Sequence, residues 1–236
     1  MKKIAFVFAL LLCGVWQLAA QPDFSALKYG VRSSIGLGSV SIKQDDNNTF
    51  QSGFQYSVGA YAELPVWRSV NVVAEIDFEH TGVHDKSSSM RVETISGISA
   101  QILSHTEIKY PLNYLRIPIL ARANILDNVL YLEAGPQLGF LVGKVETWEK
   151  SKVTTIAAGY SDTNTTEGST DSTDSFAKGH LAFDFGWGFN LGQISLGFRI
   201  CLGMTDLMPK KYKEEHGLQD MRTGFTSLQI GIRYTF

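Results

Sequence analysis

Apolar and polar side chains alternate at every second position over long stretches of this chain. The most regular stretch is Gly179–Leu191, where Leu, Phe and Trp side chains oppose Ala, Asp, Gly and Asn. A period of two is the pattern of a strand with one apolar and one polar face. We therefore predict eight strands, over residues 29–42, 53–66, 70–82, 113–123, 129–145, 179–191, 194–204 and 224–236.

The connections between these strands alternate in length. Residues 67–69, 124–128 and 192–193 form short turns, whereas residues 43–52, 83–112, 144–178 and 205–223 form long loops. Strands of about ten residues or more can cross a membrane at a tilt, and short turns opposite long loops are typical of outer-membrane barrels. We predict an all-β fold: an eight-stranded antiparallel up-and-down transmembrane β-barrel with short periplasmic turns and long extracellular loops.

The last eight residues, 229–236, alternate strictly and end on an aromatic side chain. They resemble the recognition strand of outer-membrane barrels, with Gly231, Tyr234 and Phe236 as the assembly signal. The expected partner of this strand is the barrel-assembly machinery.

The first twenty residues have the features of a signal peptide. Lys2 and Lys3 precede an apolar run from Ile4 to Val15, and small residues end the segment at Ala20. We predict domains 1–20 (signal peptide) and 21–236 (one outer-membrane β-barrel domain), with the protein in the cell outer membrane. Lipidation at Cys13 is the alternative, but Leu12 stands where a lipobox needs Gly, Ala or Ser. After cleavage Cys201 is the only cysteine, which excludes an internal disulfide.

Alternation alone does not say which face is outside, because a soluble lipocalin-like barrel also has eight strands and turns its apolar face inward. The polar face favours the membrane. The interiors of the predicted strands contain no Lys, and their polar positions are Gly, Ser, Asn, Gln, acids and Arg. We therefore expect outer-membrane lipid against the apolar face. Aromatic residues near strand ends fit interfacial girdles: Tyr56, Trp67, Tyr110, Tyr234 and Phe236.

The register directs charged residues of both signs into the barrel. Each buried charge needs a partner, and the planar guanidinium of Arg suits carboxylates well. We predict a structural interior network of Arg32, Glu63, Glu75, Asp77, Arg116, Glu133, Asp184, Arg199 and Arg233, with Arg122 and Glu79 on the same face. The alternative is a proton or ion path through a small pore, although eight strands leave room for little besides side chains.

Other candidate chemistry is weak. Asp77, Glu79, His80, His84 and Asp85 could form a metal or catalytic site at the rim, but His80 falls on the lipid-side register and His84 in a loop. We predict no catalytic, cofactor-binding or metal-binding residues and no cofactor. The net charge of −2 gives no indication of nucleic-acid binding.

The long loops differ in character. Residues 95–103 are apolar enough to extend their hairpin above the membrane. Residues 161–175 are acidic, of low complexity and free of apolar side chains, so we predict a mobile loop without the spacing of a calcium site. Asp171-Ser172-Thr173 resembles a bacterial O-glycosylation site.

The chain resembles the PorT-like family of outer-membrane barrels. The most specific pieces are Tyr114-Leu115-Arg116-Ile117-Pro118 and Glu133-Ala134-Gly135-Pro136-Gln137. Further matches are residues 29–31, 59–65, 74–78 and 230–234. The resemblance implies an eight-stranded outer-membrane barrel; one family member is associated with protein secretion, and no catalytic motif can be carried over. We expect a non-enzymatic structural or loop-mediated binding protein, with protein or glycan partners at its loops. The alternatives are a small pore and a rim enzyme acting on lipid or peptide.

Overall fold

The computed structural model describes residues 24–44, 47–95, 98–157 and 160–236. The predicted signal peptide, residues 1–20, lies outside these residues and stays a prediction. Within the described part, no helix has the length and apolarity to span a membrane.

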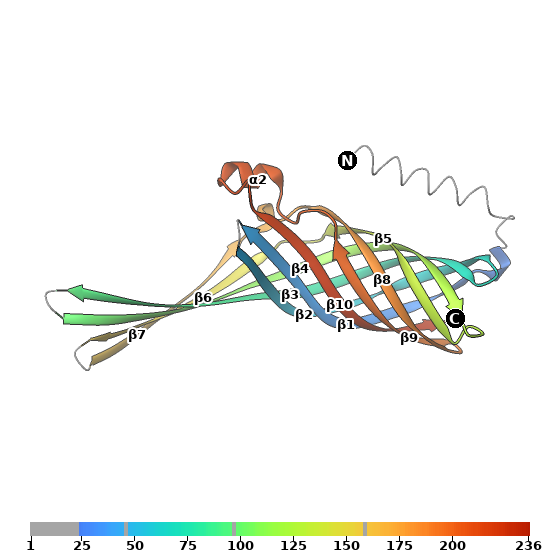
Figure 1. The fold of residues 1–236 in the computed structure, drawn as a ribbon, viewed down its shortest axis with the longest axis horizontal. Helices are drawn as coiled ribbons and strands as arrows, with labels where there is room; N and C mark the ends of the chain where they lie inside the picture. Colours follow the sequence, from blue (N-terminus) through green and yellow to red (C-terminus); the bar gives the residue numbers. More distant parts are fainter. Residues whose placement is uncertain (1–23, 45–46, 96–97, 158–159) are drawn as a thin grey trace.

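Eight antiparallel strands close into a ring (Figure 1), which confirms the predicted barrel. Neighbours along the chain pair with one another, β3 with β4 included, and β1 pairs with β10 to complete the ring. The ring strands are β1 (Lys28–Gln44), β2 (Asn47–Trp67), β3 (Val70–Ile95), β4 (Ile98–Ile125), β5 (Leu130–Leu141), β8 (Gly179–Leu191), β9 (Ile194–Gly203) and β10 (Arg222–Thr235).

Three tight turns lie at one end of the ring, where the sequence predicts them. They join β2 to β3, β4 to β5 and β8 to β9. In the last of them Gly192 has a φ of +68°, a conformation that favours glycine. The C-terminus lies at the same end, as expected for an even number of strands (Figure 1).

The other end carries a β-sheet that extends beyond the ring. β3 and β4 continue well past their predicted limits and pair from Asp85↔Ile108 to Ile95↔Ile98. β6 (Glu146–Ala157) pairs with β4, and β7 (Tyr160–Asp171) pairs with β6. We call these four paired segments, β3 and β4 beyond the ring with β6 and β7, the sheet extension. The predicted extension of the hairpin by residues 95–103 is thus in line with the fold, although residues 96–97 are outside the described part.

Parts of three predicted loops are wrong, because the described residues of 43–52 lie in β1 and β2, most of 83–112 in β3 and β4, and much of 144–178 in β6 and β7. Residues 161–171 of the predicted mobile loop lie in strand β7, all of whose side chains are exposed. Its Thr-rich sequence is compatible with a strand, and exposure on both faces removes the need for apolar residues. His84 and Asp85 lie in β3 rather than in a loop, because β4 supplies their pairing partners.

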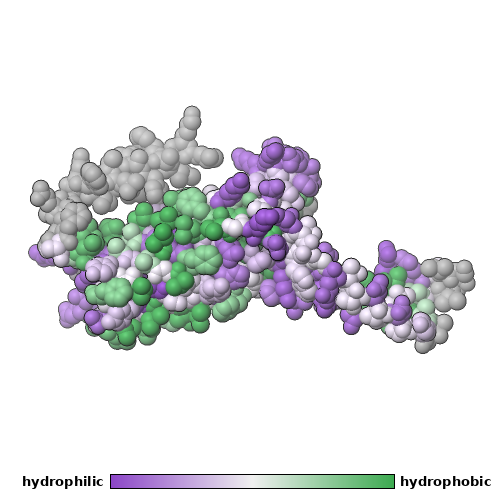
Figure 2. All heavy atoms as spheres, turned by 180° about the vertical axis from the view of Figure 1, so that it is seen from behind, coloured by the Kyte–Doolittle hydropathy of each residue, from purple (hydrophilic) through white to green (hydrophobic). Residues whose placement is uncertain are grey.

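The two faces of the ring are sorted as predicted. Phe183, Phe185 and Ile230 are 41%, 47% and 53% exposed on the outside, whereas Glu75 and Arg116 are buried inside. Figure 2 shows apolar surface gathered over the ring, polar surface where the ring meets the sheet extension, and mixed surface on the extension itself. A soluble barrel would have the opposite arrangement.

One predicted girdle residue is wrongly placed. Tyr110 does not face outward at a membrane boundary. It is half-buried against apolar side chains inside the barrel, at the end that carries the sheet extension. β4 continues through this position, and Tyr110 shares the inward register of Leu112 and Tyr114.

Candidate functional site

The structure brings all the predicted inward charges into one connected set of ion pairs. Each of the eight ring strands contributes at least one member, and every member is buried. We call this set the interior network; it consists of Arg32 on β1, Glu63 on β2, Glu75, Asp77 and Glu79 on β3, Arg116 and Arg122 on β4, Glu133 on β5, Asp184 on β8, Arg199 on β9 and Arg233 on β10.

Glu75 and Glu133 are the carboxylates with most partners. Glu75 accepts from Arg32 and Arg199, each at 2.7 Å, and from Arg233. Glu133 accepts from Arg199 at 2.6 Å and from Arg233 at 3.0 Å. Arg199 and Arg233 thus each bridge Glu75 and Glu133. These contacts join strands on opposite sides of the ring.

At the turn end, Arg122 extends the interior network. It donates to Glu133 at 3.0 Å and to Glu63 at 2.9 Å, and its guanidinium lies 4.3 Å from the centre of the Tyr131 ring. Gly197 faces Tyr131, and any side chain there would collide with the phenol oxygen. The absence of a side chain at Gly197 therefore leaves room for the Tyr131 ring.

Toward the sheet extension, the network continues through Arg116. This side chain is fully buried; it pairs with Glu79 and lies 3.5 Å from Asp184. Three amide side chains also hydrogen-bond to this part of the network. Gln55 and Gln229 donate to Glu79, and Gln137 accepts from Arg116.

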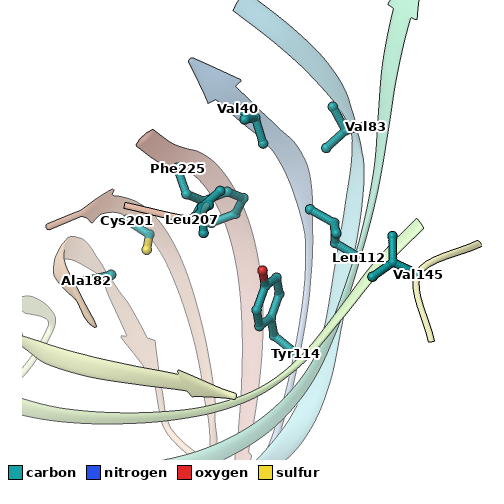
Figure 3. Close-up of a cluster of buried hydrophobic side chains, with 9 residues drawn as sticks. All are labelled: Val40, Val83, Leu112, Tyr114, Val145, Ala182, Cys201, Leu207 and Phe225. Atoms are coloured by element: carbon teal, nitrogen blue, oxygen red, sulfur yellow. The ribbon is translucent and has the colours of Figure 1, made fainter. Parts of the chain in front are cut away.

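Apolar side chains fill the next level of the barrel (Figure 3). We call them the apolar layer: Val40, Val83, Leu112, Tyr114, Val145, Ala182, Cys201, Leu207 and Phe225. Cys201 is a fully buried small side chain within it. His180 lies beside the layer, edge-on to Tyr114 with 4.7 Å between ring centres.

A pocket of about 410 Å³ opens above the apolar layer. We call it the outer pocket. Its lining is mainly apolar, with hydroxyl, amide and carboxylate groups among the apolar side chains: Val40, Ile42, Gln51, Val83, Ile108, Tyr110, Leu112, Thr147, Glu149, Thr170, Ser172, Ser175, Phe176, Leu207, Met208, Tyr212 and Thr223. Pockets of this size and composition are typical of sites for small ligands.

The segment between β9 and β10 closes one side of the outer pocket. It carries helix α2 (Lys210–Glu215), and Asp206 ties it down by accepting from Lys213 and from the backbone of Met208 at 3.1 Å. Burial alone would raise the pKa of Asp206, but the hydrogen bonds from Lys213, Thr223 and Met208 hold it below its ordinary value. The carboxylate is therefore the charged anchor of this segment.

The suspected rim cluster is not assembled. Asp77 and Glu79 point into the barrel, whereas His80 is on the outer side, 2.7 Å from Asn113. Among the described residues, no group of three or more His, Cys, Asp or Glu side chains could hold a metal ion.

The sequence did not indicate the outer pocket, because its lining comes from loops and strand ends far apart in the chain. The available signal was local: Phe176, Leu207 and Met208 are apolar residues within polar loops. Nothing in the sequence showed that these residues meet.

A protein-family model described as "Outer membrane protein beta-barrel domain" matches residues 19–208, which is most of the chain. No curated protein matches this sequence.

Several solved structures resemble the fold at low identity. Ail, the attachment invasion locus protein of Yersinia pestis, is 13% identical with a TM-score of 0.36, over 89% of this chain and 99% of that chain. Neisserial surface protein A is 9% identical with a TM-score of 0.31, over 87% and 97% of the two chains. The translocator domain of the autotransporter NalP from Neisseria meningitidis is 11% identical with a TM-score of 0.29, over 98% and 96%.

Proposed function

Because this chain belongs to the outer membrane protein beta-barrel domain family and lies in the outer membrane, we propose that it is a non-enzymatic binding protein. It acts at its extracellular end, and the barrel serves as the membrane anchor. The observation that carries this proposal is the outer pocket, which sits on a filled barrel and opens toward the sheet extension.

The filled interior supports binding over conduction. A solute entering from outside meets the apolar layer first and the interior network beneath it. An ion that passed through the barrel would have to break buried ion pairs. Breaking such a pair costs about 3–5 kcal/mol. The network therefore favours a structural role for its eleven side chains over an ion path.

The lining of the outer pocket indicates the class of ligand. Tyr110, Leu112 and Phe176 offer apolar and aromatic surface. Among the described lining residues, the only charged group is Glu149, so a neutral, mainly apolar molecule with one or two hydroxyl or amide groups fits better than an anion.

We also propose that this protein is a PorT-like member of the outer-membrane barrel proteins. The pieces Tyr114-Leu115-Arg116-Ile117-Pro118 and Glu133-Ala134-Gly135-Pro136-Gln137 support a PorT-like member. Such a protein could act as a component of a secretion or surface assembly, with protein or glycan partners at the extracellular end. Assembly of the barrel would proceed through the C-terminal strand and its Gly231, Tyr234 and Phe236.

Ligand binding is tested with N-phenyl-1-naphthylamine, a neutral apolar fluorophore, on the purified protein in nanodiscs. Trp148 neighbours the lining residues Thr147 and Glu149 and serves as the energy donor once Trp67 and Trp187 are replaced by Phe. We expect saturable energy transfer that Ser175→Phe, a change in the lining, lowers at least fivefold. Thr166→Phe on the exposed β7 is the matched control and should leave it unchanged. Equal transfer in both variants would mean lipid partitioning only and would remove the pocket from the proposal.

Planar-bilayer recording tests the filled barrel. The proposal expects no steady conductance from the folded protein. Steady single-channel currents would favour the small pore instead. A rim enzyme is tested separately: an activity on lipid or peptide that His80→Ala and His84→Ala abolish would overturn the non-enzymatic assignment.

A further inference from the structure

The sheet extension ends in two unpaired strand edges. Among the described residues, β7 pairs only with β6, and β3 pairs only with β4 from Asp85 outward, because its pairing with β2 ends at His84. An exposed strand edge presents a row of free backbone donors and acceptors, which is a template for another strand.

We call positions on β3 and β7 that are aligned through the paired residues of β4 and β6 one level of the sheet. At two such levels the two edges carry opposite charges. Across the sheet, Lys86 pairs with Glu107, Glu107 with Lys150, and Lys150 with Glu167. Side chains at directly paired positions lie on one face of a sheet, so these four form a row of alternating sign. Two of its steps are ion pairs, Lys86–Glu107 at 3.6 Å and Lys150–Glu167 at 2.6 Å.

A second level shows the same relation. Arg91 on β3 is aligned, through Ile102 and Thr155, with Asp162 on β7. At each of these two levels, the β3 edge is basic and the β7 edge acidic. At the other levels from Tyr160 to Gly168, the pairing places no like charges opposite each other.

The strand directions also match. β3 and β7 run antiparallel within the extension, since each step from β3 to β4, β6 and β7 is antiparallel. Two copies in one membrane share the same orientation and depth. The β7 of one copy beside the β3 of the next would therefore form an antiparallel pair, whereas β7 beside β7 would be parallel and acidic on both sides.

We propose that the extension is a head-to-tail contact between copies of this protein, in which β7 of one copy pairs with β3 of the next. Glu167 then lies opposite Lys86, and Asp162 opposite Arg91, so the row of alternating charges continues across the boundary. A head-to-tail contact forms a ring if its rotation closes and a row of barrels if it does not. This proposal is independent of the outer pocket.

Disulfide cross-linking in intact cells tests the pairing. Ser89 and Asn164 are level-matched partners in the proposed contact. Within one chain they are three strand spacings apart, about 14 Å, which is beyond the roughly 7 Å limit for a disulfide. In the S89C/N164C variant, any disulfide joining these positions must therefore link two copies. The one other cysteine after residue 20 of the sequence, Cys201, is buried.

We expect S89C/N164C to give a ladder of dimers and higher multiples, and the level-mismatched S89C/Y160C to give at least fivefold less. D162R or R91D added singly to S89C/N164C should lower the yield, and the two together should restore it. Heat-dependent migration on gels establishes that each variant contains a folded barrel.

Three outcomes would overturn the proposal. The first is the absence of a ladder from folded S89C/N164C. The second is a dimer from N164C alone, which would mean that β7 pairs with β7. The third is an adduct of another mass, which would mean that another protein occupies the edge.

Discussion

Arg199 on β9 holds both carboxylate oxygens of Glu75 on β3, at 2.7 and 3.0 Å, across the centre of the barrel. The two residues are 124 positions apart in the chain. Both are buried, so neither charge has water as an alternative partner. This two-point contact is the geometry in which Arg binds a carboxylate best, and it ties two strands together that do not pair in the sheet.

Glu75→Gln should destabilise the barrel by about 3–5 kcal/mol, because it leaves Arg32, Arg199 and Arg233 short of a buried counter-charge. Urea unfolding in phospholipid vesicles measures the change. The matched control is Glu107→Gln on the sheet extension, which should change the stability little, because solvent screens its ion pair with the exposed Lys86. Equal effects of the two changes would mean that the interior network does not stabilise the fold.

A charged substitution on the outer face should lower the stability of the barrel most at the middle of the membrane. Phe185→Arg is expected to cost about 2–4 kcal/mol, while Ile194→Arg beside the Gly192 turn is expected to cost about 0–1 kcal/mol, since the penalty falls toward the membrane interface. Both side chains are exposed on the outer face. The same unfolding assay gives the comparison, and similar costs at both positions would argue against a membrane boundary between them.

Removal of Phe236 should slow assembly in cells without changing the fold that is reached. Phe236 is exposed at the turn end, where it packs against Tyr29 and Tyr234, so its loss opens no cavity. We expect a several-fold lower folded fraction in cells by heat-dependent gel migration, and near-normal spontaneous folding into short-chain lipid vesicles. A defect only in the vesicles would point to stability rather than recognition.

The segment that closes the outer pocket should loosen in acid. The pKa of Asp206 is lowered in the fold, so its stabilising effect is complete above the ordinary pKa of an Asp and is lost as the pH falls through the lowered value. The protection of the amides of residues 206–223, taken as the exchange rate relative to the intrinsic rate at each pH, should therefore fall below about pH 4. Asp206→Asn should show the fast exchange already at neutral pH, and a pH-independent wild type would contradict this anchoring.

The alternation of side chains was enough to predict the ring, because a one-residue change of register would move every side chain to the wrong face. β8 begins and ends at the predicted residues, Gly179 and Leu191. Arg116 and Glu75 could be assigned to the interior for the same reason. Their individual partners could not, since these depend on how the ring closes in space.

The sheet extension was missed where burial gives no signal. The side chains of β7 are exposed on both faces, so its sequence carries no apolar alternation and resembles that of a mobile loop. β7 forms because β4 pairs with β6 and β6 in turn pairs with β7, and the composition of β7 does not indicate this pairing. The outer pocket was missed because Phe176 and Leu207 come from different loops and meet only in the folded protein.

Quenching of Trp187 by lipids with brominated acyl chains is the most direct test of the arrangement on which the account depends. Trp187 is 42% exposed on the outer face of β8, stacked on Phe198. In a variant with Trp67 and Trp148 replaced by Phe, Trp187 is the only tryptophan after residue 20. The account predicts strong quenching by bromine placed in the acyl chains and weak quenching by aqueous acrylamide. Fluorescence unaffected by the bromolipids and quenched by acrylamide would contradict it.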